Sequence, residues 1–322
     1  MRAIVIESFG PPSVLQLQKA GVPRPARGEV LVDVLYAGLN PLDYKMRDGS
    51  SGRARDLQLP AILGREFVGR VIHAGPDTDL GDLQPGQLIF GMRPLEDVRG
   101  CYAEKLVVGL DAVAPVPHGV ADEQLPALGG LALVGLTALA AVEECAHLRA
   151  GDRVLVHGGS GGVGQLLIPL ARQAGASQVW ATGRAANAER LIELGAVPIP
   201  YDEVDWQDVI HRDTDGAGLD VIIDTHYFKT FLPSLDHIAD GGRLVVLPSL
   251  ADLGPARDRG IDASIPAISP TRDKLDRLAA GFVDGSLSVE VSELLPLTDV
   301  VRGHEQLEAG HTRGKLVLDL SR

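Results

Sequence analysis

A glycine-dense turn in the middle of the chain constrains the fold more than any other feature. The apolar run Val154–Val156 leads into Gly159, Gly161 and Gly164. This Gly-x-Gly-x-x-Gly spacing lets backbone N–H groups approach a pyrophosphate at the N-terminus of the helix that follows. A strand pattern over 178–182 then arrives at the distance expected of a βαβ unit. The turn therefore predicts nucleotide binding, and a purely structural glycine turn is the alternative.

The flanking sequence predicts an α/β chain of two domains. Residues 1–121 read as short strands separated by Pro and Gly turns, which indicates an antiparallel β-rich domain. Residues 122–262 alternate strands with helices, as a doubly wound parallel sheet does. Residues 263–322 are expected to return to the first domain. The apolar strand 243–247 is expected at one edge of the parallel sheet, where it would pair with a second copy in a homodimer.

Composition limits the partners. The net charge of −13 argues against nucleic acid and anionic membranes, because both need a basic face. The uncharged stretch between Glu123 and Glu143 is interpreted as a buried helix. Cys101 and Cys145 cannot form a disulfide framework, and the N-terminal apolar run is too short for a signal sequence. We therefore expect a cytoplasmic protein that acts on a small molecule.

Several separate motifs occur in register along nearly the whole chain. They occupy residues 37–45, 60–69, 100–104, 135–137, 157–164 and 314–318. Together they resemble the medium-chain dehydrogenase/reductase superfamily, close to its zinc-free quinone oxidoreductases and enone reductases. The resemblance implies a GroES-like catalytic domain, a Rossmann domain inserted after it, and an active site in the cleft between them.

The resemblance also allows a test for catalytic zinc. Zinc-dependent relatives carry a cysteine and a histidine where this chain has Asn40 and Arg65. Arginine does not ligate zinc, and the nine scattered histidines lack the spacing of a metal site. We therefore predict no metal. Glu66 is expected to be a structural carboxylate, with a role in proton handling as the alternative.

The end of the second Rossmann strand predicts the cofactor. An NAD enzyme normally places an acidic residue there, whereas this chain reads Thr182, Gly183 and Arg184. Arg184 is suited to pair with a 2′-phosphate, so the sequence predicts NADPH, unless Arg184 is only a solvated loop residue. The remaining expected cofactor positions, most of them taken from the resemblance, are Asn40, Thr137, Ser160, Gly161, Gly162, Val163, Tyr201, Thr225 and Leu247.

Hydride delivery to a quinone or an α,β-unsaturated carbonyl needs only a few aimed donors, because negative charge grows on the carbonyl oxygen. Lys45, Tyr44 and Asn40 are the candidate catalytic residues, and the resemblance places their loop beside the nicotinamide. In the alternative interpretation Lys45 and Tyr44 only brace the loop, with Lys45 paired to Asp43 at the surface. Cys101 is expected to be a packed residue and not a nucleophile.

Two other functions stay open. An enoyl-thioester reductase would need a basic mouth for a carrier phosphate, for which Arg47, Arg53 and Arg55 are available. A non-catalytic NADPH-binding sensor or structural protein would need no working donor beside the nicotinamide. The leading prediction is an NADPH-dependent, zinc-independent reductase of quinones or α,β-unsaturated carbonyls.

Overall fold

The computed structural model describes residues 1–310 and 312–321. The chain divides into two compact units, one of residues 1–136 with 268–322 and one of residues 137–267. The first unit is built on a mixed sheet and the second on a parallel sheet, which confirms the predicted fold class. Residues 268–322 group with the first unit. Domain boundaries after residues 121 and 262 stay a prediction.

A mixed sheet forms the core of the first unit. Its strands follow the order β15-β16-β3-β5-β6-β8, and β7 also pairs with β3. The strands are β3 (Glu29–Leu39), β5 (Glu66–Ala74), β6 (Leu88–Met92), β7 (Lys105–Gly109), β8 (Val113–Pro115), β15 (Val291–Pro296) and β16 (Lys315–Asp319). A smaller sheet of order β2-β1-β4 contains β1 (Arg2–Ile6), β2 (Gln16–Lys19) and β4 (Ala61–Ile62).

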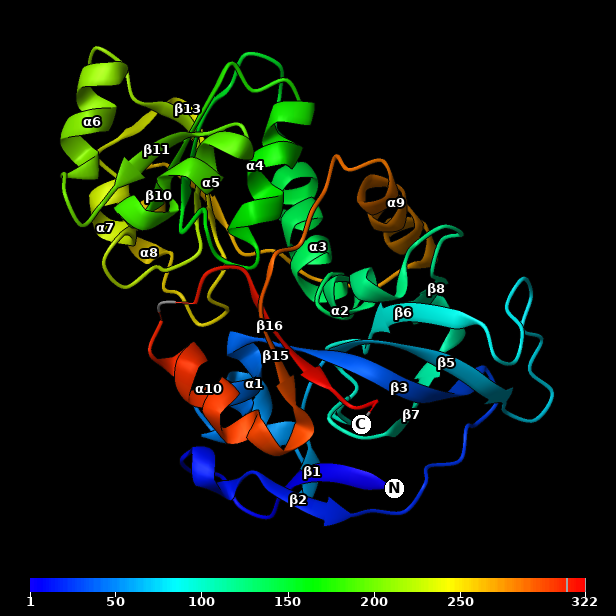
Figure 1. Cartoon of the computed structure of the whole chain (residues 1–322). Coiled ribbons are helices and arrows are strands. Elements are labelled where there is room, and N and C mark those ends of the chain that lie inside the picture. Colours follow the sequence, from blue (N-terminus) through cyan, green and yellow to red (C-terminus); the bar gives the residue numbers. More distant parts are fainter. Residues whose placement is uncertain (311, 322) are drawn as a thin grey trace. The chain divides into compact units, whose positions relative to one another are not determined.

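Strand β3 organises this unit, because it pairs with β16, β5 and β7. Its residues Val30, Val32 and Val34 recur at the strand period of two and are buried in the core. At its C-terminal end Gly38 pairs with Glu66, and Leu39 pairs with Leu316. Three segments distant in sequence therefore meet at this end, and Figure 1 shows β16, in red, beside β3, in blue.

Among the described residues, the α-helices that belong to the first unit alone are α1 (Pro41–Arg47), α2 (Leu125–Gly129), α9 (Arg272–Val283) and α10 (Val300–Glu308). The sequence reading treated the segment of α1 as a loop, and this was wrong. Asn40 is the N-cap residue, its N–H donates to the side chain of Asp43, and Pro41 occupies the first turn. Helices α1 and α10 lie side by side (Figure 1).

The second unit is a six-stranded parallel sheet of order β11-β10-β9-β12-β13-β14. Its strands are β9 (Arg153–His157), β10 (Gln178–Gly183), β11 (Val197–Pro200), β12 (Leu219–Asp224), β13 (Ile238–Val246) and β14 (Asp262–Ser264). Its helices are α4 (Gly164–Gln173), α5 (Ala188–Glu193), α6 (Trp206–Asp213), α7 (Phe231–Ser234) and α8 (Gly254–Asp258). The predicted strand and helix order is confirmed up to β13.

The two edges of this sheet differ in chemistry. The strand expected at an edge, 243–247, lies inside the sheet, because β14 pairs beyond it. That expectation was wrong, because the short strand β14 pairs with β13 and forms the edge in its place. On the opposite edge, the N–H of Tyr201 donates to Gly183 of β10 at 3.1 Å. Since alternate residues of a strand face the same side, the nitrogens of Pro198 and Pro200 point away from β10 and offer no donor.

The uncharged stretch after Glu123 is not one helix. It forms α2, α3 (Ala132–Leu139) and a π-helical turn over Ala140–Cys145, and most of these residues are buried. Among the described residues, no single helix is long and apolar enough to cross a membrane. The segments Asp122–Gly129 and Ala132–Cys145 meet the length and composition criteria only when they are taken together, and they are bent by 55° relative to each other.

The glycine turn should tolerate substitution unevenly. A Cβ at Gly164 would lie 2.3 Å from the carbonyl oxygen of Gly158, whereas a Cβ at Gly161 would meet that oxygen at 3.4 Å, an ordinary contact. We expect Gly164→Ala to lower the free energy of unfolding by about 1–3 kcal/mol, because backbone must move. Gly161→Ala is the matched control and should change it by less than about 0.5 kcal/mol. Urea unfolding tests this, and equal stability of the two variants would contradict it.

Candidate functional site

The expected cofactor positions of the second unit gather at the carboxyl ends of its parallel strands. The segment 158–164 follows β9, Arg184 follows β10 and Tyr201 follows β11. Thr225 and Leu247 follow β12 and β13 in the same way. Ligands of open parallel sheets bind at this edge, so the sheet brings these residues to one place. Thr137 lies in the second unit and Asn40 in the first.

The glycine turn is held to its neighbouring strands by hydrogen bonds. The N–H of Gly158 donates to Thr182 Oγ1 at 3.0 Å, and the N–H of Gly159 donates to the Thr182 carbonyl at 2.9 Å. The Thr225 hydroxyl donates to the carbonyl of His157 at 2.8 Å. Thr182 and Thr225 therefore brace the turn.

Some backbone N–H groups of the glycine turn have no acceptor within the described part of the chain. Within the described part of the chain, the N–H groups of Ser160, Val163 and Gly164 donate to no protein acceptor. Side chains crowd the start of the turn, since a Cβ at Gly158 would lie 2.4 Å from Thr225 Oγ1. Asn187 donates to the Ser160 hydroxyl at 3.1 Å. Free N–H groups before helix α4 are what a pyrophosphate requires.

The end of β10 carries Arg184 and, unexpectedly, a carboxylate close by. Arg184 is exposed, and among the described residues its guanidinium makes no hydrogen bond or ion pair. Asp202 accepts a hydrogen bond from the N–H of Ala185 at 2.9 Å. The sequence reading missed Asp202, because it lies 18 residues beyond Arg184 and only the pairing of β10 with β11 brings the two segments together. Tyr201, beside it, is 46% exposed.

In the first unit Asn40 is the centre of a buried polar cluster. Its Nδ2 donates to Glu66 Oε1 at 2.8 Å, and its Oδ1 accepts from Lys315 Nζ at 2.6 Å. Lys315 also donates to Glu66 Oε1 at 2.7 Å, and Glu66 Oε2 accepts from the N–H of Leu133 at 2.8 Å. All three polar side chains are buried. Glu66 is thus a hydrogen-bonded carboxylate.

The two other candidate catalytic residues lie on α1. Tyr44 and Lys45 are half-buried, and Lys45 Nζ lies 5.9 Å from the centre of the Tyr44 ring. Burial raises the pKa of Tyr44 and lowers the pKa of Lys45, with Asp48 opposing the second shift. Neither side chain makes a hydrogen bond or an ion pair with another described residue. Their polar ends are therefore available to a ligand.

Asp43 does not pair with Lys45. It is 1% exposed, and its Oδ2 accepts from the N–H of Asn40 at 2.8 Å and from the Tyr102 hydroxyl at 2.7 Å. Burial raises the pKa of Asp43 to about 6. The interpretation in which Asp43 holds Lys45 at the surface was therefore wrong.

Two of the three basic residues named for a phosphate mouth are held by contacts within the unit, and the third, Arg55, is exposed and donates to the Gly52 carbonyl at 2.6 Å. Arg47 is buried; its guanidinium donates to the Gly10 carbonyl at 3.0 Å, approaches His304 Nδ1 at 3.3 Å and pairs with Glu308. Arg53 donates to the carbonyl of Leu95 at 3.3 Å. These contacts tie α1 and its neighbouring turn to the rest of the unit.

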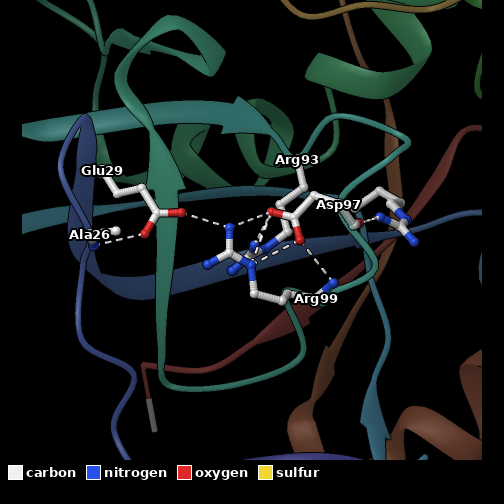
Figure 2. A network of polar contacts seen from close by, with 6 residues as sticks. Ala26, Glu29, Arg93, Asp97 and Arg99 are labelled. Atoms are coloured by element: carbon white, nitrogen blue, oxygen red, sulfur yellow. Dashed lines mark hydrogen bonds and ion pairs between the residues drawn. The ribbon is translucent and has the colours of Figure 1, made fainter. Parts of the chain in front are cut away.

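A further arginine network holds the segment after β6, as Figure 2 shows. Arg93 pairs with Asp97 at 2.6 Å, and Arg99 bridges Asp97 at 2.8 Å and Glu29 at 2.7 Å. Arg65 donates to the carbonyl of Asp97. The residue that replaces the histidine of zinc-dependent relatives is thus committed to bracing a loop.

Cys101 lies in the core of the same unit. It is fully buried, and burial raises its pKa to about 12. A thiol of that pKa supplies almost no thiolate near neutrality, so the expectation of a packed residue is confirmed.

The side chains around Asn40 do not fit a zinc ion. The ammonium of Lys315 donates hydrogen bonds to the oxygen atoms of Asn40 and Glu66. Arg65 is a cation that donates to the carbonyl of Asp97. Over residues 1–310 and 312–321, no three His, Cys, Asp or Glu side chains gather as a possible metal site. Zinc binds through free lone pairs on N, S or O atoms, and an ammonium beside those atoms uses the lone pairs and repels the metal cation.

Sequence reasoning missed Lys315 as a member of the site. It begins β16 and is followed by Leu316, Val317 and Leu318, so the sequence showed a lysine at the start of an apolar strand. A lysine that begins a buried strand is a signal that a partner must exist, since an isolated buried charge is costly. The signal does not identify the partner.

A glycine turn at the carboxyl edge of a parallel sheet, joined in sequence to a mixed β unit, defines a nucleotide-binding oxidoreductase architecture. The alcohol dehydrogenase GroES-like domain family matches residues 26–118, and the zinc-binding dehydrogenase family matches residues 194–318.

Solved structures and curated proteins agree with these matches. The chain is 33% identical to the quinone oxidoreductase of Coxiella burnetii, with a TM-score of 0.91 over 99% of each chain. It is 26% identical to the Escherichia coli quinone oxidoreductase complexed with NADPH, with a TM-score of 0.87 over 99% of this chain and all of the other. It is 29% identical to the quinone oxidoreductase of Rattus norvegicus, over 98% of this chain and 96% of the rat protein. The chain belongs to the medium-chain dehydrogenase/reductase superfamily, in its quinone oxidoreductase branch.

The pH dependence of stability should report the contact between α1 and α10. Burial and, to a lesser extent, the positive charge of Arg47 lower the pKa of His304 to about 3. Because the folded pKa lies below the unfolded value near 6.5, the stability gained from neutral His304 is present above pH 6.5 and is lost as pH falls toward 3. His304→Asn keeps an acceptor toward Arg47 but does not titrate, so its free energy of unfolding should fall less steeply between pH 6.5 and 4.

Urea unfolding at several pH values measures this difference. The exposed His118→Asn variant is the control and should follow the wild-type curve. Parallel curves for wild type and His304→Asn would show that His304 does not titrate differently in the folded state.

Proposed function

We propose that this chain is a zinc-independent reductase that uses NADPH to reduce a quinone or an α,β-unsaturated carbonyl compound. The observation that carries the proposal is the pair Tyr44 and Lys45, two half-buried donors that make no hydrogen bond or ion pair with other described residues. They stand beside a cluster whose cation is a lysine and not a metal. The oxidoreductase relatives and the NADPH complex of the Escherichia coli enzyme support it.

The residues of the second unit fit NADPH. The N–H groups of Ser160, Val163 and Gly164 would hold the pyrophosphate at the start of α4, and Arg184 would pair with the 2′-phosphate. Tyr201 would lie near the adenine, and Leu247 nearer the nicotinamide. Asp202 is the one residue of this group that would repel the 2′-phosphate, but its Oδ1 accepts from the backbone of Ala185. The other expected cofactor residues keep the roles given by the resemblance.

The residues of α1 and its N-cap would handle charge on the substrate. NADPH, when bound, supplies the hydride. As hydride arrives at the β-carbon of an enone, negative charge grows on the carbonyl oxygen, and the N–H groups of Lys45 and the hydroxyl of Tyr44 are the available donors. The raised pKa of Tyr44 keeps it protonated but makes it a weak acid, so water is the better source of the α-carbon proton. Asn40, with both ends of its amide engaged, orients the start of α1.

We also propose a homodimer formed through strand β14. The edge at β11 lacks two donors, because Pro198 and Pro200 turn their nitrogens outward, whereas β14 presents Asp262–Ser264 without proline. The expected cytoplasmic location stays a prediction. The enoyl-thioester alternative is not favoured, because Arg47 is buried and Arg53 is bonded to the backbone.

Loss of the Lys45 charge should slow the reaction. We expect Lys45→Met to lower kcat for an enone or quinone by about 10- to 100-fold, because a donor to the developing oxyanion is lost. NADPH oxidation followed by absorbance with a panel of enals, enones and quinones measures the rate, and the exposed Lys19→Met variant is the control. Unchanged kcat and NADPH affinity would remove Lys45 from the mechanism. Tight NADPH binding without any turnover of the panel by the wild type would favour a sensor.

The charge of Arg184 should determine cofactor choice. We expect Arg184→Glu to raise KM for NADPH by about tenfold or more and to change KM for NADH by about twofold or less, because only NADPH carries the 2′-phosphate. Steady-state kinetics with both cofactors test this. Arg212→Glu reverses an exposed charge on α6 of the same unit and should alter neither value. Equal kinetics with both cofactors before and after the Arg184 change would refute the assignment.

A further inference from the structure

The buried ammonium of Lys315 has a bonding pattern that stability alone does not explain. Lys315 is 3% exposed, and its Nζ donates to the Leu39 carbonyl at 2.9 Å, to Asn40 Oδ1 at 2.6 Å and to Glu66 Oε1 at 2.7 Å. An ammonium has three protons, so every donor is used. A buried ion pair returns little net stability compared with apolar residues of similar volume. A buried lysine with three fixed acceptors does, however, hold the groups that accept from it in place.

The pattern fixes the direction of one amide. An ammonium can face only the oxygen of the Asn40 side chain, and a carboxylate oxygen can accept only from its nitrogen. Lys315 and Glu66 thus hold opposite ends of the amide, at 2.6 Å and 2.8 Å. A rotation of the amide by half a turn would set nitrogen against ammonium and oxygen against carboxylate.

The fold makes room for this cluster. A Cβ at Gly38 would lie 2.4 Å from Glu66 Oε1, and a Cβ at Gly130 would lie 3.1 Å from the Cε of Lys315. Glycine at these positions lets the carboxylate and the lysine stem approach the backbone. The second carboxylate oxygen is satisfied by the N–H of Leu133.

The amide in turn belongs to the N-cap of α1. The N–H of Asn40 donates to Asp43 Oδ2 at 2.8 Å, and the N–H of Asp43 donates back to the Asn40 carbonyl at 2.9 Å. Tyr44 and Lys45 follow within the first two turns of this helix. A shift of Asn40 is therefore passed to both candidate donors.

We propose that Lys315 is a positioning residue of the hydride transfer, which fixes the Asn40 amide and, through it, the start of the helix that carries Tyr44 and Lys45. This inference rests on the proposed function. The ammonium of Lys315 is bonded to the oxygen atoms of Asn40 and Glu66, so its positive charge neutralises the negative charge of the Glu66 carboxylate. It need not touch the substrate to affect the rate.

The test compares Lys315→Met with the double variant Lys315→Met/Glu66→Gln. The single variant leaves a buried carboxylate without its cation and should lose stability, whereas the double variant removes both charges and should regain much of it. The single variant leaves the amide oxygen of Asn40 without its ammonium and keeps only Glu66 on the amide nitrogen, and the double variant keeps neither charge, so both hold the amide less firmly. We expect kcat to fall by about 10- to 100-fold in both, with KM for NADPH changed by about threefold or less.

The control is Lys105→Met, which removes a lysine from the same sheet where it forms a partly exposed ion pair with Asp33. It should keep the wild-type kcat. All rates are measured well below the midpoint of unfolding of each variant. Recovery of kcat together with stability in the double variant would show that Lys315 is only structural and would overturn the proposal.

A second readout does not depend on turnover. The nicotinamide fluorescence of bound NADPH should differ between wild type and both Lys315 variants, while titration gives similar affinities. Absence of wild-type turnover on the whole panel would contradict the proposed function, and the fluorescence would then decide on Lys315 alone. If Lys315→Met does not fold, the double variant decides. Unchanged fluorescence and unchanged kcat in a folded variant would each refute the positioning role.

Discussion

The buried contact between Lys315 and Glu66 holds together three parts of the first unit that are far apart in sequence. Lys315 begins β16, Glu66 begins β5, and both meet Asn40 just after β3. Away from water, a charge that loses its partner carries its full desolvation cost, so each of the three segments depends on the other two. The position of α1 follows from this contact, because Asn40 is the N-cap of that helix.

The sequence was sufficient for the second unit but less so for its margins. The glycines at 159, 161 and 164 and the regular spacing of apolar strands predicted a parallel sheet, and the structure confirms it. The prediction that residues 243–247 form an edge of the sheet was wrong because the true edge strand, β14, has only three residues, Asp262–Ser264, and shows no apolar alternation. Helix α1 escaped notice for a similar reason: seven residues give fewer than two turns of periodicity.

The same limits apply to the candidate site. The sequence named Asn40, Tyr44 and Lys45, and the alternative interpretation paired Lys45 with Asp43. On a helix, residues two positions apart point in nearly opposite directions, and here Asp43 is buried while Lys45 is only half-buried. The partners of Asn40 come from other strands, and Asp202 comes close to the segment of Arg184 only through the pairing of β10 with β11. A single sequence contains no signal for such pairings. Asp202 and Lys315 could be found only once the strands were paired.

An acidic chain that binds a polyanionic cofactor must rely on short-range donors. The net charge of −13 repels phosphate at a distance, but at physiological salt this repulsion is screened beyond about 8 Å. Within that range we expect the N–H groups of the glycine turn and the guanidinium of Arg184 to dominate, since charge-assisted hydrogen bonds act over about 3 Å. In the first unit the buried negative charge of Glu66 is likewise neutralised at short range, by the ammonium of Lys315 at 2.7 Å. In each unit the positive charge near the candidate site comes from residues whose positions are set by the strand order. The net charge of the whole chain can therefore be negative without affecting these local contacts.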